Sequence, residues 1–135
     1  IITDIITGFP GETDEDHQET VDLLNQLSPD LVNVTRFSPR KGTPASRYKR
    51  INGRIVKKRS RELTNLRKEL GAKSFKRFVG KETSVLTVEN KRKGSTLCRD
   101  DNYRPIILKQ ELPLGEFYDV KIIDSEYGFM TAILV

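Results

Sequence analysis

The chain has 135 residues, of which 36% are hydrophobic and 32% are charged, a composition that suits one ordinary domain or two small ones. It holds no run of about 18 apolar residues and no basic segment leading into an apolar one, so we expect neither a membrane-spanning helix nor a secretory signal. A single cysteine, Cys98, excludes an internal disulfide framework and any zinc or iron–sulfur centre built from several thiolates of this chain.

Charge is segregated strongly along the chain, although its formal net charge is only +5. Residues 1–35 contain eight acidic and no basic residues, and residues 82–135 contain nine acidic and seven basic ones. Residues 36–81 contain 17 Lys or Arg and only two Glu, a local charge of +15. Such a segment repels itself unless a polyanion binds it, and nucleic acid is the expected polyanion. A solvated, lysine-rich helix is the alternative.

The first 37 residues follow a strand–helix–strand pattern. Residues 1–9 are apolar and β-branched, which is typical of a strand buried on both faces. Thr13 is placed to cap a helix that runs to Leu27, with Asp16 as the capping-box partner, and a second strand at residues 31–37 completes a βαβ unit. Because Ile1 falls inside the first apolar run, we expect the chain to be a piece of a longer polypeptide.

A long basic helix is predicted after a loop. Residues 38–52 are rich in Pro, Gly and Arg and predict a loop with one short helical turn. Residues 55–78 predict the helix, and its apolar stripe is narrow. The stripe and its extension consist of Leu63, Leu66, Leu70, Phe75 and Phe78.

From residue 79 onward the pattern changes to short alternating stretches separated by turn residues, which predicts an all-β domain. The predicted strands are residues 83–89, 96–99, 103–109, 117–125 and 129–135. Five strands in about 55 residues bury enough apolar surface only by curling into a small barrel. Cys98 falls in the second of these strands, and we expect it to be a small buried hydrophobic residue.

Two loops are candidates for ligand binding. Gly8–Thr13 reads GFPGET and Phe37–Thr43 reads FSPRKGT, and each follows a predicted parallel strand. The carboxyl ends of parallel strands lie at one edge of a sheet, where helix N-termini and free amides attract ligands. We therefore expect both loops to line one pocket. In the alternative reading, Pro and Gly only shape the turns and Thr13 only caps the helix.

These motifs resemble those of a known family. TDIITGFPGETDEDHQETVDLL followed by VNVTRFSPRKGTPA resembles the end of the radical-SAM barrel in the methylthiotransferases. VGKETSVLTVE, the CRDDNYRPIIL stretch and the last strand pair resemble the TRAM domain of that family. The pattern is most similar to the archaeal and eukaryotic branch, which methylthiolates N6-threonylcarbamoyladenosine next to the tRNA anticodon.

The resemblance implies a multidomain α+β architecture. Residues 1–78 are then the C-terminal part of a radical-SAM (β/α) barrel. They form an incomplete βαβ portion of that barrel together with the long basic helix that links it to the next domain. Residues 79–135 are then a five-stranded antiparallel, OB-like TRAM barrel that binds RNA. Two strands and one helix standing alone leave the edge of the first strand unpaired, so we also expect a strand-exchanged dimer.

The resemblance also implies cofactors. The family uses S-adenosylmethionine and two [4Fe-4S] clusters held by cysteine triads, which are expected to precede Ile1, so this chain alone is expected to be inactive. Arg36 or Arg40 is expected to neutralise either the methionine carboxylate or an RNA phosphate, and His17 is expected to pack at a helix edge. The residues implied near S-adenosylmethionine are Ile6, Gly8, Pro10, Glu12, Arg36 and Arg40.

An RNA site is expected on the barrel. Basic side chains beside an aromatic ring suit an unpaired RNA loop, because bases stack on the ring while cations neutralise phosphates. The expected partner is the tRNA anticodon stem-loop in the cytoplasm, without membrane contact. The alternatives are a stand-alone RNA-binding adaptor and an unrelated α/β ligand-binding domain. The predicted RNA-binding residues are Lys91, Arg92, Lys93, Arg99, Tyr103 and Arg104.

Overall fold

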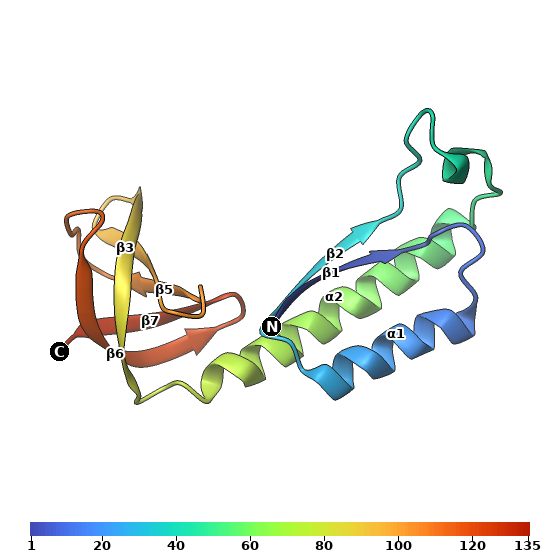
Figure 1. Cartoon of the computed structure of the whole chain (residues 1–135). Helices are drawn as coiled ribbons and strands as arrows, with labels where there is room; N and C mark the ends of the chain where they lie inside the picture. The colour runs from blue at the N-terminus through green and yellow to red at the C-terminus, as the bar shows by residue number, and fades with distance from the viewer. The chain divides into compact units, whose positions relative to one another are not determined.

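The computed structural model describes residues 1–135, with Lys91 and Arg92 described by their backbone only. The chain forms two compact units, the N-terminal unit (residues 1–71) and the barrel unit (residues 72–135). The elements shown in Figure 1 are β1 (Ile2–Thr7), α1 (Asp14–Leu27), β2 (Leu31–Arg36), η1 (Pro44–Arg47), α2 (Gly53–Lys76), β3 (Glu82–Arg92), β4 (Ser95–Arg99), β5 (Pro105–Leu108), β6 (Phe117–Glu126) and β7 (Phe129–Leu134).

The N-terminal unit is built on two parallel strands. β1 pairs with β2, starting with Ile2 opposite Leu31, and α1 connects them, which confirms the predicted strand–helix–strand order. The predicted capping box is also confirmed. Thr13 Oγ1 accepts a hydrogen bond from the Asp16 amide at 3.1 Å, and the Asp16 carboxylate accepts one from the Thr13 amide at 2.8 Å.

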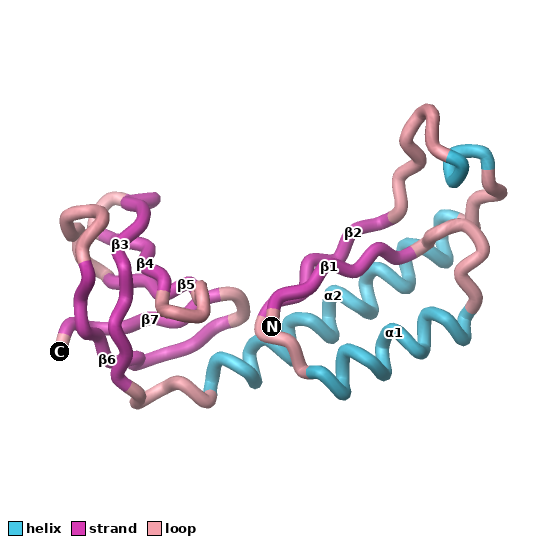
Figure 2. Tube along the Cα trace, viewed as in Figure 1, coloured by secondary structure: helices cyan, strands magenta, loops and turns pink.

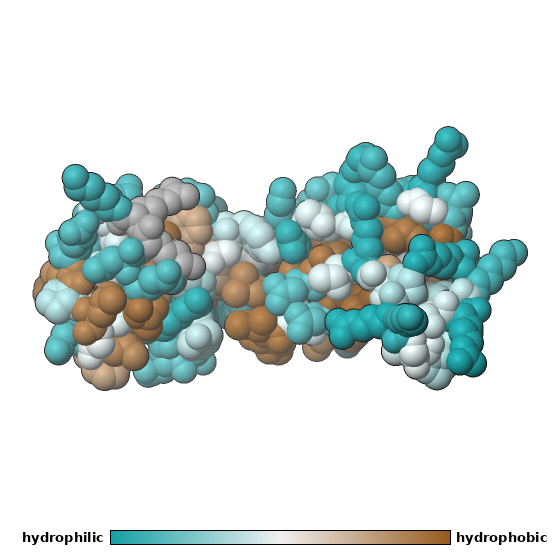
Figure 3. Space-filling model, turned by 90° about the horizontal axis from the view of Figure 1, so that it is seen from above, coloured by the Kyte–Doolittle hydropathy of each residue, from teal (hydrophilic) through white to brown (hydrophobic). Residues whose placement is uncertain are grey.

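Helices α1 and α2 cover one face of this small sheet (Figure 1), and the core lies between them and the sheet. The buried apolar side chains of this core are Leu24, Val32, Leu63 and Leu70. The other face is open, so Ile2 and Ile6 are 51% and 59% exposed, and the expectation of a strand buried on both faces is wrong for this chain. Figure 3 shows apolar surface lying among hydrophilic side chains over this unit.

The predicted end of the first helix is confirmed, because α1 ends at Leu27, and Leu27 itself is 48% exposed. The bounds of the second helix differ from the prediction of residues 55–78. α2 begins at Gly53, two residues before the predicted start, and ends at Lys76. The connection from β2 to α2 is a loop that holds the short 3₁₀ helix η1, as Figure 2 shows, and this confirms the predicted helical turn.

The barrel unit is a closed barrel with the strand order β3-β4-β5-β7-β6. All five strands predicted from the sequence are present. The expectation of a purely antiparallel barrel is wrong, because β5 and β7 pair in parallel. The reason is topological: around a closed ring with an odd number of strands, strand directions cannot alternate at every step.

The interior of the barrel is filled by alternate side chains of its strands. The buried apolar residues of these strands are Val85, Cys98, Ile106, Leu108, Val120, Ile122, Met130 and Ala132. Cys98 is fully buried, which confirms its predicted role as a small hydrophobic side chain, and burial raises its pKa to about 11. Phe75, near the end of α2, is also fully buried and belongs to the barrel unit.

Candidate nucleic-acid interface and cofactor loop

The β4–β5 turn is held rigidly by one buried carboxylate. Asp100 Oδ1 accepts hydrogen bonds from the amides of Asn102 and Arg104, at 3.0 and 2.8 Å, and Oδ2 accepts one from Arg104 Nη1 at 3.0 Å. The Asp100 side chain is only 7% exposed, so this ion pair is shielded from water. The turn therefore presents its side chains on a fixed backbone.

Tyr103 is the exposed aromatic residue of this turn. Its backbone adopts the left-handed conformation with φ of 62°, which is rare for a bulky residue and is stored strain. The Arg99 guanidinium lies 4.5 Å from the centre of the Tyr103 ring, and Arg99 Nη1 donates to the Tyr103 carbonyl at 3.1 Å. Tyr103 is 66% exposed, so an aromatic surface backed by a cation faces solvent.

A second group of cations surrounds Phe78, which follows α2. The charged ends of Arg104, Arg77 and Lys81 lie 4.3, 4.9 and 5.5 Å from the ring centre. Sequence reasoning missed this group as a site, although the string KRFVGK places cations on both sides of Phe78. Arg104 connects the group to the β4–β5 turn, so both belong to one cationic and aromatic surface.

The predicted RNA-binding residues fall at two ends of one strand. The structure brings Arg99, Tyr103 and Arg104 together at the end of β4, whereas Lys93 is exposed on the turn before β4. β4 has five residues, so its two ends, next to which these turns lie, are ~13 Å apart at ~3.3 Å per residue. The other two predicted contacts, the side chains of Lys91 and Arg92, lie outside the described residues.

The GFPGET loop after β1 closes tightly on itself. Gly8 has φ of 79°, and its amide donates to Glu12 Oε2 at 3.1 Å. A Cβ added at Gly8 lies 2.6 Å from the Val56 side chain, so a side chain at this position requires Val56 to shift. Only glycine meets both the backbone conformation and the close approach.

Arg59 of α2 holds this loop against the start of α1. Arg59 Nη1 donates to Glu12 Oε1 at 2.6 Å and to the Glu12 carbonyl at 3.1 Å, and Nη2 donates to Asp14 Oδ1 at 2.7 Å. Burial works to lower the pKa of Arg59, but its hydrogen bonds to Asp14 and Glu12 outweigh burial and raise it. The same hydrogen bond and the charge of Arg59 lower the pKa of the Asp14 carboxyl.

Sequence reasoning missed Arg59 because it is one of many cations in this segment. The available signal was its spacing, since Arg59 precedes Leu63 by four residues and therefore lies on the buried stripe of the helix. A cation on an apolar stripe requires carboxylates nearby, and Glu12 and Asp14 supply them. His17 is likewise buried, with Nε2 3.0 Å from Glu62 Oε2, in agreement with its predicted packing role.

The two predicted loops meet at the carboxyl ends of β1 and β2. The Phe9 and Phe37 rings lie edge to face with centres 5.1 Å apart, and the Phe37 amide donates to the Thr7 carbonyl at 2.8 Å. Thr7 Oγ1 is buried and has no hydrogen-bond partner among the described residues. This strand end therefore offers a hydroxyl group that a ligand can satisfy.

The residues predicted to lie near S-adenosylmethionine differ in their solvent exposure and in their contacts within the chain. Ile6 is exposed on the open face of the sheet, Pro10 is half-buried, and Arg36 and Arg40 are exposed. Glu12 has both carboxylate oxygens engaged by its own chain, so its role in this structure is to hold the loop.

Two further properties concern the described part of the chain. No helix in it is both long and apolar enough to cross a membrane. Its His, Cys, Asp and Glu side chains form no group of three or more placed to hold a metal ion.

The barrel unit corresponds to a known domain class. Residues 76–135 match the TRAM domain family, so the closed five-stranded barrel and the last residue of α2 are the TRAM portion of the chain.

The comparison with known proteins extends over nearly the whole chain. A protein of Archaeoglobus fulgidus named "Probable threonylcarbamoyladenosine tRNA methylthiotransferase" is 45% identical over 130 residues, which cover 96% of this chain and 30% of that protein. A protein of Pyrococcus horikoshii with the same name is 40% identical over 133 residues, covering 98% and 31%. The "Threonylcarbamoyladenosine tRNA methylthiotransferase" of Xenopus laevis is 32% identical over 132 residues, covering 96% and 23%.

Over nearly its whole length the chain is therefore similar to proteins named threonylcarbamoyladenosine tRNA methylthiotransferases, and its residues 76–135 match the TRAM domain family. It spans about a quarter to a third of the length of these relatives.

Proposed function

We propose that the chain is the C-terminal, RNA-binding part of an enzyme that adds a methylthio group to N6-threonylcarbamoyladenosine next to the tRNA anticodon. The names of the relatives and the TRAM match support this assignment. A stand-alone RNA-binding adaptor is the weaker candidate, because the similarity to these enzymes includes the N-terminal unit as well as the barrel.

The observation that carries the proposal is the surface formed by Arg99, Tyr103 and Arg104. An exposed ring on a strained, rigid turn suits stacking on an unpaired base, and the adjoining guanidinium groups suit phosphates. A duplex does not expose base faces to such a ring. The proposed partner is therefore the single-stranded loop of the anticodon stem-loop in the cytoplasm.

We further propose that the N-terminal unit, with the linking helix to residue 78, is the last part of a radical-SAM barrel, and that residues 79–135 act as the RNA-binding domain. S-adenosylmethionine and the [4Fe-4S] clusters supply the methyl group and the radical chemistry of such enzymes, and the clusters belong to other parts of the parent protein. This chain alone is then inactive.

The carboxyl ends of β1 and β2 fit S-adenosylmethionine in the groups they offer. Gly8 offers backbone without a side chain, and Ile6 offers an exposed apolar side chain. Thr7 offers a hydroxyl group that has no hydrogen-bond partner in the described chain. Arg36 and Arg40 are exposed cations that suit a carboxylate. Glu12 holds the loop through Gly8 and Arg59, and Pro10 shapes its turn.

Fluorescence anisotropy with a labelled anticodon stem-loop tests the RNA-binding proposal. We expect binding that weakens with salt. The slope of log K against the logarithm of the salt concentration is expected to be about −0.7 for each phosphate neutralised on a single strand. Arg99→Gln is expected to weaken binding by about 5- to 30-fold, because it removes a phosphate contact and the cation behind Tyr103. Lys121→Gln, the same charge change at another exposed position of the barrel, is the control and is expected to change binding by less than about threefold. Absence of binding in dilute buffer, or equal effects of the two substitutions, contradicts the proposal.

A further inference from the structure

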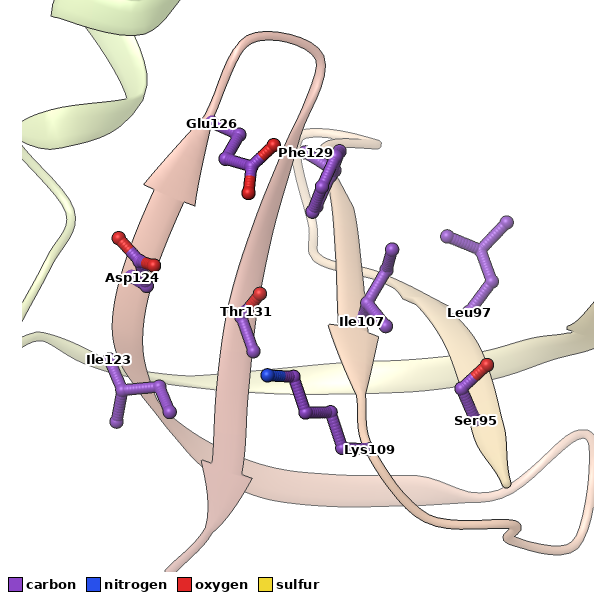
Figure 4. Close-up of a pocket in the computed structure, with 9 residues that line it drawn as sticks. All are labelled: Ser95, Leu97, Ile107, Lys109, Ile123, Asp124, Glu126, Phe129 and Thr131. Carbon is purple, nitrogen blue, oxygen red and sulfur yellow. The ribbon is translucent and has the colours of Figure 1, made fainter. Parts of the chain in front are cut away.

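The outer wall of the barrel carries a mostly apolar groove of about 600 Å³ that the predicted RNA contacts do not include (Figure 4). Its volume is in the range of small-ligand sites. Its lining residues come from four neighbouring strands and are Ser95, Leu97, Ile107, Lys109, Ile123, Asp124, Glu126, Phe129 and Thr131.

The strand registers build the floor of the groove as a row across the barrel wall. Leu97 lies opposite Ile107, Ile107 opposite Thr131, and Thr131 opposite Asp124. Phe129 stands at one end of the groove, across the β6–β7 ladder from Glu126 (Figure 4). The floor is therefore apolar on the β4–β5 side and acidic on the β6 side.

A bulge in β6 adds a carboxylate to this wall. The β6–β7 register shifts between Ile122 and Asp124, so that Ile123 and Asp124 are both exposed while Ile122 is buried. Without the shift, strict alternation turns one of these two consecutive side chains inward. Lys109 reaches over the floor beside Thr131 and is the only cation among the described residues that line the groove (Figure 4).

The groove lies along β4, between the two turns that carry the predicted RNA contacts. Arg99 and Tyr103 are at one end of the strand, Lys93 is at the other, and Leu97 of the groove floor is between them. An RNA strand that joins these two cationic turns crosses the groove. In OB-type barrels, the face formed by the second and third strands, here β4 and β5, is the usual oligonucleotide face.

We propose that the groove binds one unpaired guanine of the same RNA strand, an inference that rests on the proposed RNA-binding function. The base lies on Leu97 and Ile107 with Phe129 at its edge. Guanine carries two adjacent N–H donors on its Watson–Crick edge, which suit the carboxylates of Asp124 and Glu126. Its neighbouring carbonyl oxygen suits the ammonium group of Lys109.

The two carboxylates favour a base that carries hydrogen-bond donors. A carboxylate on a phosphate-binding face repels the ligand unless it accepts hydrogen bonds from that ligand. Adenine and cytosine offer one amino group beside a ring acceptor, and uracil offers one N–H between two carbonyl oxygens. Guanine is therefore the best match and uracil the worst, with a difference in affinity of roughly 5- to 150-fold for a good two-bond contact.

The test measures binding of the chain to heptauridylate and to the same oligomer with a central guanosine, adenosine or cytidine. We expect the guanosine oligomer to bind at least about fivefold more tightly than heptauridylate. In the double variant Asp124→Asn and Glu126→Gln, the guanosine preference is expected to disappear, while general affinity stays the same or rises because two negative charges are removed. Both side chains are exposed, so the fold is expected to be retained, and circular dichroism checks this.

A matched pair of phenylalanine variants tests the apolar part of the groove. Phe129→Ala is expected to weaken binding of the guanosine oligomer by about 5- to 30-fold. Phe117→Ala is the control, because Phe117 is an exposed phenylalanine of the same barrel outside the groove, and it is expected to change binding by less than about twofold.

The outcomes separate this inference from the proposed function. Salt-dependent binding of all four oligomers with equal affinity, unchanged in the groove variants, overturns the guanine site and leaves RNA binding intact. Failure of the unmodified chain to bind any oligomer or the stem-loop overturns RNA binding itself. A Phe129→Ala variant that keeps full RNA affinity but loses self-association assigns the groove to a protein contact and also overturns the inference.

Discussion

At the scale of single residues, Tyr103 keeps an unfavourable backbone conformation at the proposed RNA-binding surface. A left-handed backbone at a tyrosine is unfavourable by about 1 kcal/mol or more, and glycine removes that cost. Asp100 and Arg104 hold the turn in place with buried hydrogen bonds, so the strained conformation persists. Strain of this kind is typical of binding sites.

We therefore expect Tyr103→Gly to raise the thermal stability of the barrel and to weaken stem-loop binding by about 5- to 30-fold, because the stacking surface is lost. Tyr103→Phe keeps the aromatic face and is expected to retain most of the affinity. Thermal melts and anisotropy on the same samples measure both quantities. If Tyr103→Gly leaves the affinity for the stem-loop unchanged, Tyr103 is not part of the RNA interface.

Cys98 gives a prediction that concerns only the barrel interior. Burial raises its pKa to about 11, so at pH 8 the folded chain holds very little of the thiolate that reacts with alkylating agents. We expect iodoacetamide at pH 8 to label the native chain at least about 50 times more slowly than the chain in denaturant. Mass spectrometry of timed samples measures the rates, and fast native labelling contradicts a buried Cys98.

At the scale of elements, the Arg59 contact ties α2 to the GFPGET loop and to the first turn of α1. Arg59→Met is expected to destabilise the N-terminal unit by about 3 kcal/mol, because it leaves the largely buried Glu12 carboxylate without its cation. Glu12→Gln is expected to cost less, and the double variant less than the sum, since the two side chains act as a pair. Urea denaturation of the four proteins provides the cycle, and purely additive effects contradict the pairing.

The same contact predicts a pH dependence. The pKa of Asp14 is lowered in the folded chain by the hydrogen bond and charge of Arg59, so the ionised form stabilises the fold at pH above the ordinary carboxyl value of about 3.9. This contribution is lost as the pH falls through the lowered pKa. We expect the difference in stability between the unmodified chain and Arg59→Met to shrink below about pH 4, and a difference that grows there contradicts the assignment.

The elements also show how far sequence reasoning extends. The cap at Thr13, the strand–helix–strand order and the five barrel strands followed from local patterns, because caps, turns and alternation act over a few residues. The parallel β5–β7 pair and the buried Arg59 did not follow, because both depend on contacts between segments distant in sequence. The groove was missed for the same reason: Leu97 and Asp124 meet only through strand registers and a bulge.

At the scale of the whole molecule, the two units have separate hydrophobic cores, and they differ in whether the edges of their strands are paired. The barrel is closed and leaves no strand edge unpaired, whereas the two-stranded sheet of the N-terminal unit has a free outer edge at β1 and another at β2 in the described chain. Exposed Ile2 and Ile6 lie on the open face of that sheet. A free strand edge beside apolar surface favours pairing with a second copy.

We therefore expect this chain to self-associate into a dimer through β1, with a concentration dependence that sedimentation velocity detects. Ile6→Lys places a charge on the open sheet face and is expected to shift the chain towards monomer. Ile55→Lys is the control, because Ile55 is an exposed isoleucine of α2 and not of the sheet. A monomer at every concentration, or equal effects of the two substitutions, contradicts association through β1.

Whether single-stranded RNA lies across β4 and β5 of the barrel is tested most directly by amide hydrogen exchange of the chain with and without the anticodon stem-loop. The predicted result is slower exchange at the β4–β5 turn around Tyr103 and along β4 when RNA is bound, diminished in Arg99→Gln. Slower exchange confined to the N-terminal unit, or no change anywhere in the barrel at saturating RNA, contradicts the RNA interface proposed for this protein.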